Sequence, residues 1–463
     1  MFKIRQLVWV VLLLAKRIFK ILQETSDFKR LEEEVGGLVQ QATSQMLYHA
    51  LEEIDQKLLA QREESLRVVG KRQRTLVTSA GEITIQRRIY RQRDGTYRFL
   101  LDEALGLESH RRISPRMQEM ASELATEVPF RRAAEILNYL VPGVNSMSVW
   151  NAVQEAGERA YQEAEKLKKS VFEYGEGPEG EEAAQQLYIE GDEVHLKQQR
   201  GAKKGMGLKL IVGYEGKDNS RLQNRYSVAG VASGPEIWDE ASCYFGCKWS
   251  LSQVEKIRIG GDGADWIKQG VEQFSHASYH LDPFHLRRRL TEALSFSSSA
   301  YQKVCEGIAE LDRVATMEAL DQALLRVKGA RKKRVKELKT YLQDNWEGIV
   351  QLPEEERMGA IEGQVRHTIT RRMKRIGARW TKEGANRMGR LLAAKSNGEL
   401  SNYVNNPEIS LGDLVDLEKP IKEEAVKEKD IEEELRGSMP ALKGPHASRF
   451  WVKHVLKELA SIQ

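Results

Sequence analysis

The sequence predicts a multidomain α+β protein, and three changes of pattern along the chain lead to this prediction. Residues 1–70 repeat apolar residues at spacings of three and four and contain no proline, which is typical of helix. Residues 71–108 alternate apolar and polar residues with a period of two, which is typical of strands. From residue 183 onward, short strand-like segments alternate with helical ones. Such successive regions are expected to fold as several units in one chain.

Composition and charge point to a partner that carries many negative charges. The chain has 463 residues, of which 30% are charged, and its net charge is +4. Between residues 71 and 98 there are eight basic residues and only two acidic ones, and further basic runs follow later in the chain. Several separate basic clusters predict contact with a long polyanion, and double-stranded DNA is the expected partner.

The cysteine count and the length of the N-terminal apolar run indicate where the protein is located. Three cysteines make no disulfide framework, which fits the reducing cytoplasm, so a cytoplasmic protein is expected. The apolar run near the N-terminus is about ten residues long, which is too short to span a bilayer. We therefore expect a helical N-terminal region over residues 1–70 and no membrane partner.

Residues 71–108 are predicted to form a small antiparallel sheet with arginines along one face. Two glycine-containing turns, "SAGE" and "RDGT", separate its strands. The arginines expected to contact DNA are Arg72, Arg74, Arg87, Arg88 and Arg91. The alternative is a sheet whose solvent face is simply basic.

Residues 109–172 are predicted to contain a helix-turn-helix. The helix "PFRRAAEILNYL" is followed by a break at Pro142 and Gly143, and Ser146 is expected to cap a second helix that reaches about Gly157. The side chains offered to a major groove are Asn145, Ser148 and Asn151. We expect residues 71–160 to bind duplex DNA without the rest of the chain. An ordinary helical hairpin would show the same pattern.

Residues 183–290 have the order of elements of a ribonuclease H-like core. The segments "QQLYIEGD", "EVHLKQQ", "GLKLIVGYEG" and "NRYSVAGVA" are expected to form an antiparallel meander. A helix, a strand, a second helix and a last strand follow. Residues 291–355 are predicted to be a helical insertion, residues 356–405 the closing helix of the core, and residues 406–463 a charged linker with a C-terminal helix.

Carboxylates at the ends of two of these strands predict a metal centre. Asp192 is expected to end the first strand, and Asp262 follows the fourth strand in "GGDGADW". The ends of these two strands lie side by side in this fold, so the carboxylates converge on a site suited to Mg²⁺ or Mn²⁺. A third acid should come from the helix after the insertion, where Glu362 and Glu383 are the candidates. Glu190 and Glu193 are expected to point away from Asp192.

Six segments spread over residues 25–405 carry a resemblance to a known family. They are "KRQRTLVTSAGEITIQRRIY", "LLDEALGL", "YIEGDEVH", "HLDPFHLRRRL", "YLQDNWEGI" and "EGQVRHTITRRMKRIGARWTKEGANRM". Together they resemble the ISLre-type insertion-sequence transposases, which are similar to Mutator-like DDE transposases with a ribonuclease H-like core. The resemblance implies DNA transposition by a DDE triad, in which Asp192 and Asp262 match the first two acids. It favours Glu362 over Glu383 as the third acid, although Glu383 and Gly384 form a second Glu-Gly pair.

Further basic residues and two rival functions complete the set of expectations. Arg287, Arg371 and Arg372 are expected to contact DNA, the alternative for Arg287 being simple exposure to solvent. Asp282 and His285 either lie near the metal or the DNA, or are an acid at a helix start and a packed histidine. The protein is expected to act as a homo-oligomer on DNA. One rival function is a non-catalytic helix-turn-helix DNA-binding protein, and the other is a ribonuclease H-like nuclease without strand transfer.

Overall fold

The computed structural model describes residues 14–21, 23, 27–109, 111–177, 179–200, 204–218, 221–350 and 358–404. All of these residues belong to one compact unit, Met1–Ile409. The predicted linker and C-terminal helix at residues 406–463 lie outside the described residues. Within the described part, the fold is mixed α and β, and none of its helices is long and apolar enough to cross a membrane.

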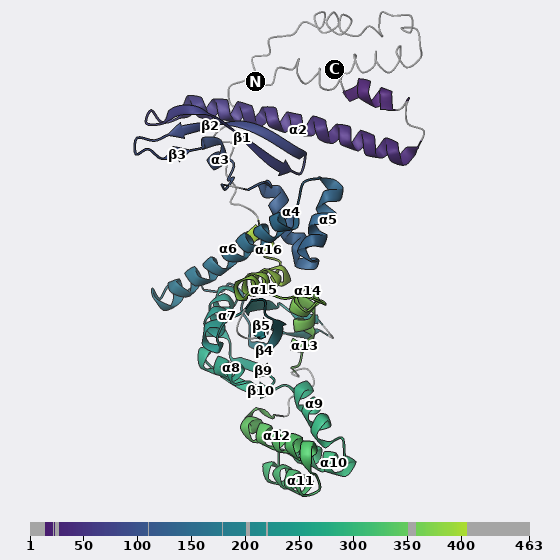
Figure 1. Cartoon of the computed structure of the whole chain (residues 1–463). Coiled ribbons are helices and arrows are strands. Elements are labelled where there is room, and N and C mark those ends of the chain that lie inside the picture. The colour runs from purple at the N-terminus through teal and green to yellow at the C-terminus, as the bar shows by residue number, and fades with distance from the viewer. Residues whose placement is uncertain are drawn as a thin grey trace, which may run out of the picture. The chain divides into compact units, whose positions relative to one another are not determined.

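A long helix packs on a three-stranded sheet near the start of the chain (Figure 1). Helix α2 (Phe28–Gln61) begins at Asp27, whose carboxylate accepts a hydrogen bond from the backbone of Lys29. The antiparallel strands β1 (Arg67–Thr78), β2 (Gly81–Arg91) and β3 (Tyr97–Arg98) follow, and then the short helix α3 (Leu100–Ala104). The helix thus ends and the first strand begins a few residues before the predicted boundary at residue 71.

Three helices connect this sheet to the next one. They are α4 (Pro115–Glu127), α5 (Phe130–Leu140) and α6 (Ser146–Phe172). The turn between α5 and α6 is organised by Asn138, whose side chain bonds the backbone of both Gly143 and Val144. Asn145, and not Ser146, caps α6, and the helix continues well past Gly157. It continues because Ala156, Gly157 and Ala160 stay buried against its neighbours.

The second sheet is mixed and has the strand order β10-β9-β4-β5-β8. Its strands are β4 (Gln186–Lys197), β5 (Gly205–Tyr214), β8 (Tyr226–Gly230), β9 (Lys256–Gly261) and β10 (Ala277–Leu281). β5 is antiparallel to both β4 and β8, whereas β9 is parallel to β4 and β10. A separate hairpin, β6 (Gly216–Asp218) with β7 (Arg221–Gln223), lies between β5 and β8 in the chain.

One predicted strand boundary was wrong. "QQLYIEGD" and "EVHLKQQ" are a single strand, β4, so Asp192 lies inside a strand and does not end one. Gly191 does not break the strand, because β4 stays paired with β5 on both sides of it. A Cβ at this position would lie 3.1 Å from the ring of Trp266, so the glycine allows this ring to pack closely.

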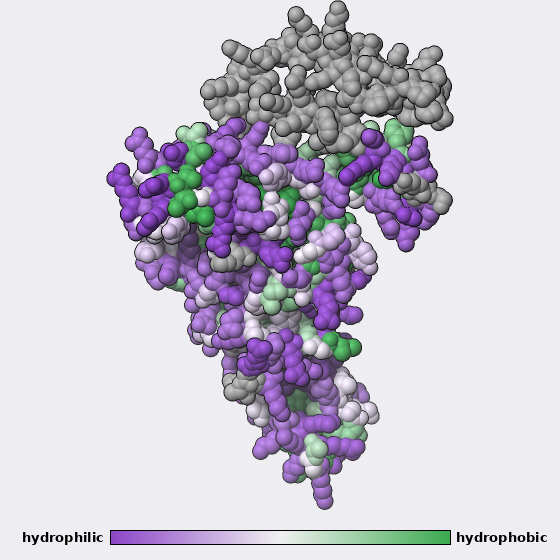
Figure 2. Space-filling model, turned by 45° about the horizontal axis from the view of Figure 1, so that its top comes forward, coloured by the Kyte–Doolittle hydropathy of each residue, from purple (hydrophilic) through white to green (hydrophobic). Residues whose placement is uncertain are grey.

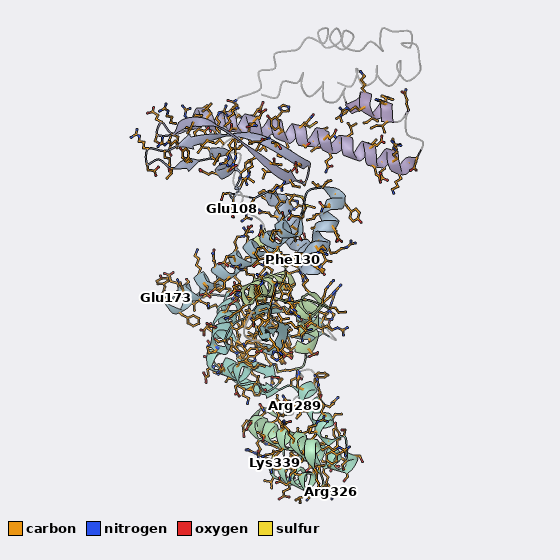
Figure 3. All side chains as sticks on the ribbon, in the orientation of Figure 1. Glu108, Phe130, Glu173, Arg289, Arg326 and Lys339 are labelled. Carbon is orange, nitrogen blue, oxygen red and sulfur yellow. The ribbon has the colours of Figure 1, made fainter. Side chains whose placement is uncertain are left out.

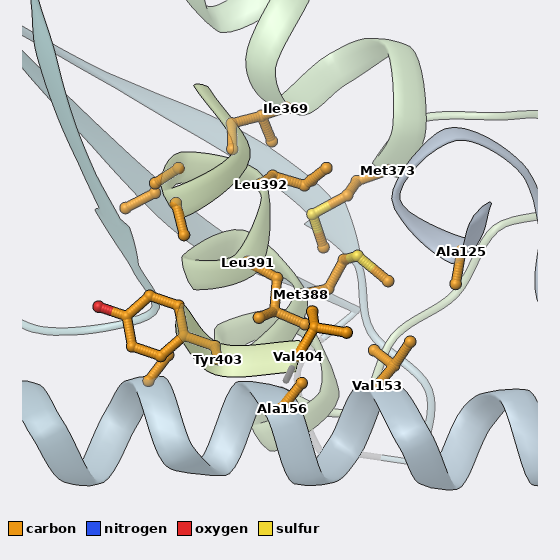
Figure 4. Packing of buried hydrophobic residues seen from close by; sticks show 14 of the residues in the cluster. Ala125, Val153, Ala156, Ile369, Met373, Met388, Leu391, Leu392, Tyr403 and Val404 are labelled. Atoms are coloured by element: carbon orange, nitrogen blue, oxygen red, sulfur yellow. The ribbon is translucent and has the colours of Figure 1, made fainter. Parts of the chain in front are cut away.

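Helices cover both faces of this sheet. On one face, Leu187, Ile189 and Ile211 pack against α7 (Gly234–Lys248) and α8 (Asp265–Lys268). On the other face, Leu208 and Leu210 belong to a core that also includes residues of α6 and α15 (Lys382–Asn397). Figure 4 shows Met388 and Leu391 packing beside Val153 and Ala156 of α6. The 3-10 helices η1 (Leu251–Gln253) and η2 (Gln269–Gln273) complete the connections.

The predicted insertion is helical and has a core of its own. It consists of α9 (Pro283–Leu294), α10 (Ser298–Ala309), α11 (Arg313–Leu325) and α12 (Gly329–Asn345), followed by η3 (Trp346–Gly348). Figure 3 labels Arg289 on α9 and Lys339 on α12. Leu294, Val304 and Leu342 are fully buried among these helices. The hydroxyl of Tyr341 donates to the backbone oxygen of Asp262 at 2.8 Å, which attaches the insertion beside the predicted metal centre.

The chain then returns to the second sheet through a broken helix. Its parts are α13 (Ile361–Val365), a π-helical turn η5 (Arg366–Thr370) and α14 (Arg371–Met373), with α15 and α16 (Leu400–Val404) after them.

The face of the molecule in Figure 2 is mostly hydrophilic, with small separate hydrophobic areas.

Candidate active site and nucleic-acid interface

The pairing of β4 with β9 places the first two predicted acids side by side. In this parallel pair Glu190 lies opposite Gly260. β9 ends at the next residue, Gly261, so continuing the same register past the end of the strand brings Asp262 to the level of Asp192. Neighbouring strands are about 4.8 Å apart, and residues at the same level of a sheet point to the same face. Asp262 follows the last residue of β9 directly, as predicted.

The electrostatics of Asp192 show that the third predicted acid belongs to the same neighbourhood. Burial is the main cause that raises the pKa of Asp192 to about 6, and the carboxylates of Asp262 and Glu362 raise it further. The backbone N–H of Glu193, which donates to Asp192 at 2.7 Å, and the charge of His285 act in the opposite direction. Three acids from β4, the end of β9 and α13 therefore share one electrostatic site.

The buried carboxylate of Glu190, which we expected to point away from this site, connects β4 to the start of α13. Glu190 is 1% exposed and lies two residues before Asp192, hence on the same face of β4. Its carboxylate accepts hydrogen bonds from the backbone N–H groups of Gly359 (2.9 Å), Ala360 (3.1 Å) and Ile361 (3.2 Å). These three amides start α13, the helix that carries Glu362. The prediction for Glu190 was wrong, because residues two apart in a strand share a face.

Tyr214 of β5 completes the environment of this carboxylate. Its hydroxyl donates to Glu190, and burial together with the Glu190 charge raises the pKa of Tyr214, so the hydroxyl stays protonated. Glu193, in contrast, does point away as expected: it lies 3.5 Å from Lys209 and 3.5 Å from His195. The spacing Glu190-x-Asp192 was the signal in the sequence that could have identified Glu190.

Asp282 and His285 form a further pair beside the acids. Asp282 follows β10, and its backbone N–H donates to Gly261 at 2.8 Å. Its buried carboxylate accepts from the backbone of Phe284 at 2.9 Å and pairs with Nδ1 of His285 at 2.7 Å. This hydrogen bond, helped by the charges of Asp192 and Asp262, raises the pKa of His285 against the opposing effect of burial. The hydrogen bond to Asp282 and the charges of the nearby acids thus stabilise the protonated form of this imidazole.

The alternative third acid lies elsewhere. Glu383 is in the first turn of α15, and Trp380, just before this helix, bridges to Gln198 beyond the C-terminal end of β4. Six residues of strand separate Gln198 from Asp192, which is about 20 Å. After burial, the charge of Glu362 is among the main causes that raise the pKa of Asp192.

The donor set suits a hard divalent cation, but it does not form a closed cage. Carboxylate oxygens are the ligands that Mg²⁺ and Mn²⁺ prefer, and a cation would relieve the repulsion that raises the pKa of Asp192. In the described ranges, however, no three His, Cys, Asp or Glu side chains are arranged closely enough to hold a metal ion. Asp192 and Asp262 are fixed by the sheet, whereas Glu362 is exposed at the start of α13. The side chain of Glu362 is therefore the one that would have to turn.

Asp192→Asn is expected to stabilise the cation-free protein at pH 7 by on the order of 1–2 kcal/mol. The folded-state pKa of Asp192, about 6, is raised above the ordinary value of 3.8, so the wild type loses stability as the pH rises through about 6. Asn carries no charge at any pH, so the difference should vanish toward pH 4. Urea unfolding in EDTA between pH 4 and 8 measures it. Asp265→Asn, an exposed acid nearby, is the matched control, and equal behaviour of both variants would contradict the expectation.

The arginines predicted to contact DNA fall into two groups. The first group has side chains that are exposed and could contact DNA, namely Arg72, Arg91, Arg287 and Arg371. Four others are largely buried and have partners in the protein: Arg74 and Arg87 pair with Asp102, Arg88 pairs with Asp55, and Arg372 donates to the backbone oxygen of Ala125 at 2.6 Å. For this second group the structure does not support the predicted DNA contact, because carboxylates and carbonyls distant in the sequence already bind these guanidinium groups.

The predicted major-groove residues lie at the exposed start of α6. Asn145 and Asn151 are exposed and Ser148 is half-buried. The Asn145 side chain accepts from the backbone N–H of Ser148 at 2.8 Å, so Asn145 and Ser148 also serve to cap the helix. The predicted fragment 71–160 omits α2 and hence Asp55, the buried partner of Arg88. A DNA-binding fragment would therefore need α2.

Arg88→Met is expected to destabilise the protein by about 3–5 kcal/mol, because it leaves the carboxylate of Asp55 buried without its cation. Arg72→Met changes an exposed side chain, so it should cost less than about 0.5 kcal/mol and instead weaken binding to duplex DNA. Chemical denaturation and a DNA titration of both full-length variants separate the two effects. The reverse pattern would show that Arg88, and not Arg72, faces the DNA.

Comparisons with known proteins give one family. The model of the uncharacterised protein family UPF0236 matches residues 21–408. UPF0236 protein TTE2489 of Caldanaerobacter subterraneus subsp. tengcongensis is 31% identical over 359 residues, which are 75% of this chain and 74% of the relative. A second protein of that organism, whose name joins eleven locus designations from TTE0033 to TTE2212, is 31% identical over 387 residues, 81% and 79% of the two chains. The UPF0236 protein in vanSb 3'region of Streptococcus gallolyticus is 28% identical over 410 residues, 84% and 87% of the two chains.

Proposed function

We propose that this chain, which belongs to the uncharacterised protein family UPF0236, is a DNA transposase of a bacterial insertion sequence. It would bind the element ends as a homo-oligomer in the cytoplasm and catalyse strand cleavage and strand transfer with Asp192, Asp262 and Glu362. The observation that carries the proposal is the electrostatic interaction of these three acids: Asp192 lies on β4, Asp262 directly follows the parallel neighbour β9, and Glu362 lies on a helix whose first backbone amides bond to Glu190.

The topology of the second sheet supports the same proposal. Three antiparallel strands are followed in the chain by two strands parallel to the first, in the order β10-β9-β4-β5-β8. A ribonuclease H-like core is expected to have this order, and its acids are expected at the adjoining strands β4 and β9. The resemblance to ISLre-type transposases, taken from the sequence, implies the same core.

The name of one relative indicates that several loci in its organism encode this protein. Eleven locus designations of one organism share a single protein name. Several loci that share one protein name in one organism are expected of an element that moves by inserting itself at new places. This supports a mobile element over an ordinary regulator.

The proposed chemistry assigns a role to each side chain. The carboxylates of Asp192, Asp262 and Glu362 would hold Mg²⁺ or Mn²⁺, which when bound supplies charge stabilisation to the attacking and leaving oxygens of phosphoryl transfer. Water would first attack the scissile phosphodiester and release a 3′ hydroxyl, which would then attack a phosphodiester of the target DNA. Nδ1 of His285 is committed to Asp282, so Nε2 is the atom at which this residue would exchange a proton.

An in vitro assay on element ends tests this function. The purified full-length protein should cleave a duplex that carries the element end, and should join a pre-cleaved 3′ end to target DNA, with Mg²⁺ and not with EDTA. Cleavage without joining would favour a nuclease. Binding without any cleavage under these conditions would favour the DNA-binding regulator and overturn the proposed enzyme.

A further inference from the structure

We propose that the turn at residues 375–378 is a wedge that inserts Ile376 between base pairs of DNA and bends the duplex. The proposal rests on the DNA substrate proposed above and adds a binding mode to it. Four features carry the proposal: the exposure of Ile376, the rigidity of the turn, the charge of the groove beside it, and the position of both next to α6.

The apolar side chain of Ile376 is exposed to water, which is energetically unfavourable. It is fully exposed, at 106% of the reference area, although it sits in a well-anchored segment. The backbone N–H of Ala378 donates to Arg375 at 3.0 Å and closes a tight turn, with Ile376 at its second position. Gly377 takes φ +78°, a conformation that favours glycine. The turn thus presents the isoleucine at its tip.

Both ends of this turn are fixed to the rest of the protein. Before it, Arg372 donates to Ala125, and its guanidinium lies 5.2 Å from the ring of Phe130, which is labelled in Figure 3. After it, Trp380 donates its backbone N–H to Lys197 at 3.0 Å and its indole N–H to Met373 at 3.1 Å. An apolar tip on a rigid base can enter a base step without first being ordered, so little entropy is lost on binding.

The groove beside the turn has the charge that nucleic acid requires. It has a volume of about 650 Å³, and its described lining contains four arginines and no aspartate or glutamate. These arginines are Arg200, Arg372, Arg375 and Arg379. Arg372 is committed to the backbone oxygen of Ala125, so the exposed Arg200, Arg375 and Arg379 are the side chains that would bind an anion in the groove. Phosphates that flank an opened base step would supply this anion.

The groove continues from the helix-turn-helix. Met147 and Trp150, from the first turns of α6, line its other side and are 61% and 42% exposed. The same turns carry Asn145 and Asn151, the predicted base contacts. Proteins that bend DNA insert an isoleucine, leucine, methionine or phenylalanine between base steps while neighbouring arginines bind the backbone. Ile376 has the same combination of neighbours, because Arg375 precedes it on the turn and Arg379 directly follows the turn.

The bending of a fluorophore-labelled duplex by the full-length protein, measured by energy transfer in EDTA, tests the wedge. The wild type should bring the two labels closer, and 2-aminopurine in the duplex should brighten as its base unstacks. Ile376→Ala should lose at least half of the bending signal with only a few-fold loss of affinity. Arg375→Gln and Arg379→Gln should each reduce the salt dependence of binding by about one ion. Leu325→Ala on α11, where the leucine is 88% exposed, is the matched control and should bend DNA like the wild type.

Two results would overturn the proposal. One is wild-type bending by Ile376→Ala. The other is a change of oligomeric state in Ile376→Ala, seen by light scattering, with unchanged bending, which would make the tip a contact between copies of the chain. Because the assay needs neither metal nor cleavage, a protein that bends DNA but never cleaves it would contradict the transposase and leave the wedge in place.

Discussion

Asp192→Asn, Asp262→Asn and Glu362→Gln are each expected to reduce strand cleavage and joining by about 10³-fold or more, and to leave DNA binding largely unchanged. Each substitution keeps the shape of the side chain and removes one negative charge from the common site. A hard divalent cation then loses an anionic ligand, and the stabilisation that it gives to the attacking and leaving oxygens is lost. DNA affinity depends on basic surfaces elsewhere, such as Arg72 and Arg371, so a gel-shift titration should show little change.

Glu383→Gln is the matched control for this experiment. Glu383 is also a glutamate followed by glycine, but it lies at the start of α15, which begins near the C-terminal end of β4, whereas Asp192 lies in the middle of that strand. Its cleavage rate should stay within a few-fold of the wild type. An inactive Glu383→Gln beside an active Glu362→Gln would move the third ligand to α15. Normal cleavage by all four variants would rule out the carboxylate mechanism.

Much of the second sheet could be predicted from the sequence, because strand patterns and helix patterns are local. The alternation of strands and helices after residue 183 predicted the element order, and the spacing of Asp192 and Asp262 predicted that these two acids belong to neighbouring strand segments. The boundary after Asp192 could not be predicted locally. Gly191 and three carboxylates weaken a strand, and only the pairing of β4 with β5 through Lys197 overrides them.

What the sequence could not provide were partners distant along the chain. Arg88 looks like an exposed basic residue until α2 brings Asp55 against it, and Arg372 looks the same until α4 offers the carbonyl of Ala125. Charge runs predict a basic surface only if nothing pairs with them, and pairing is a property of the tertiary structure. The same limit explains why Glu190 was misassigned. Its partners, Gly359, Ala360 and Ile361, follow about 170 residues later.

Glu190→Gln is expected to lower the cleavage rate by about 10–100-fold, the second largest effect after the triad. The carboxylate accepts three backbone N–H groups, and a glutamine amide nitrogen cannot accept any of them. At least one amide at the start of α13 would lose its partner, at a cost of about 1–3 kcal/mol, and α13 would be held less firmly. Glu362 would then be misplaced, so kcat should fall more than KM rises.

Tyr214→Phe is the matched control for the Glu190 variant, because it removes one donor to the same carboxylate and leaves the three backbone hydrogen bonds. Its rate should fall less than tenfold. Hydrogen exchange distinguishes a positioning role from a general loss of stability: in Glu190→Gln the amides of Gly359, Ala360 and Ile361 should exchange faster, while those of β5 keep their protection. Unchanged exchange at these three amides would mean that Glu190 does not hold α13, whatever happens to cleavage. If exchange rises as expected but the wild type shows no cleavage, the contact between β4 and α13 is real and the proposed reaction is the part that fails.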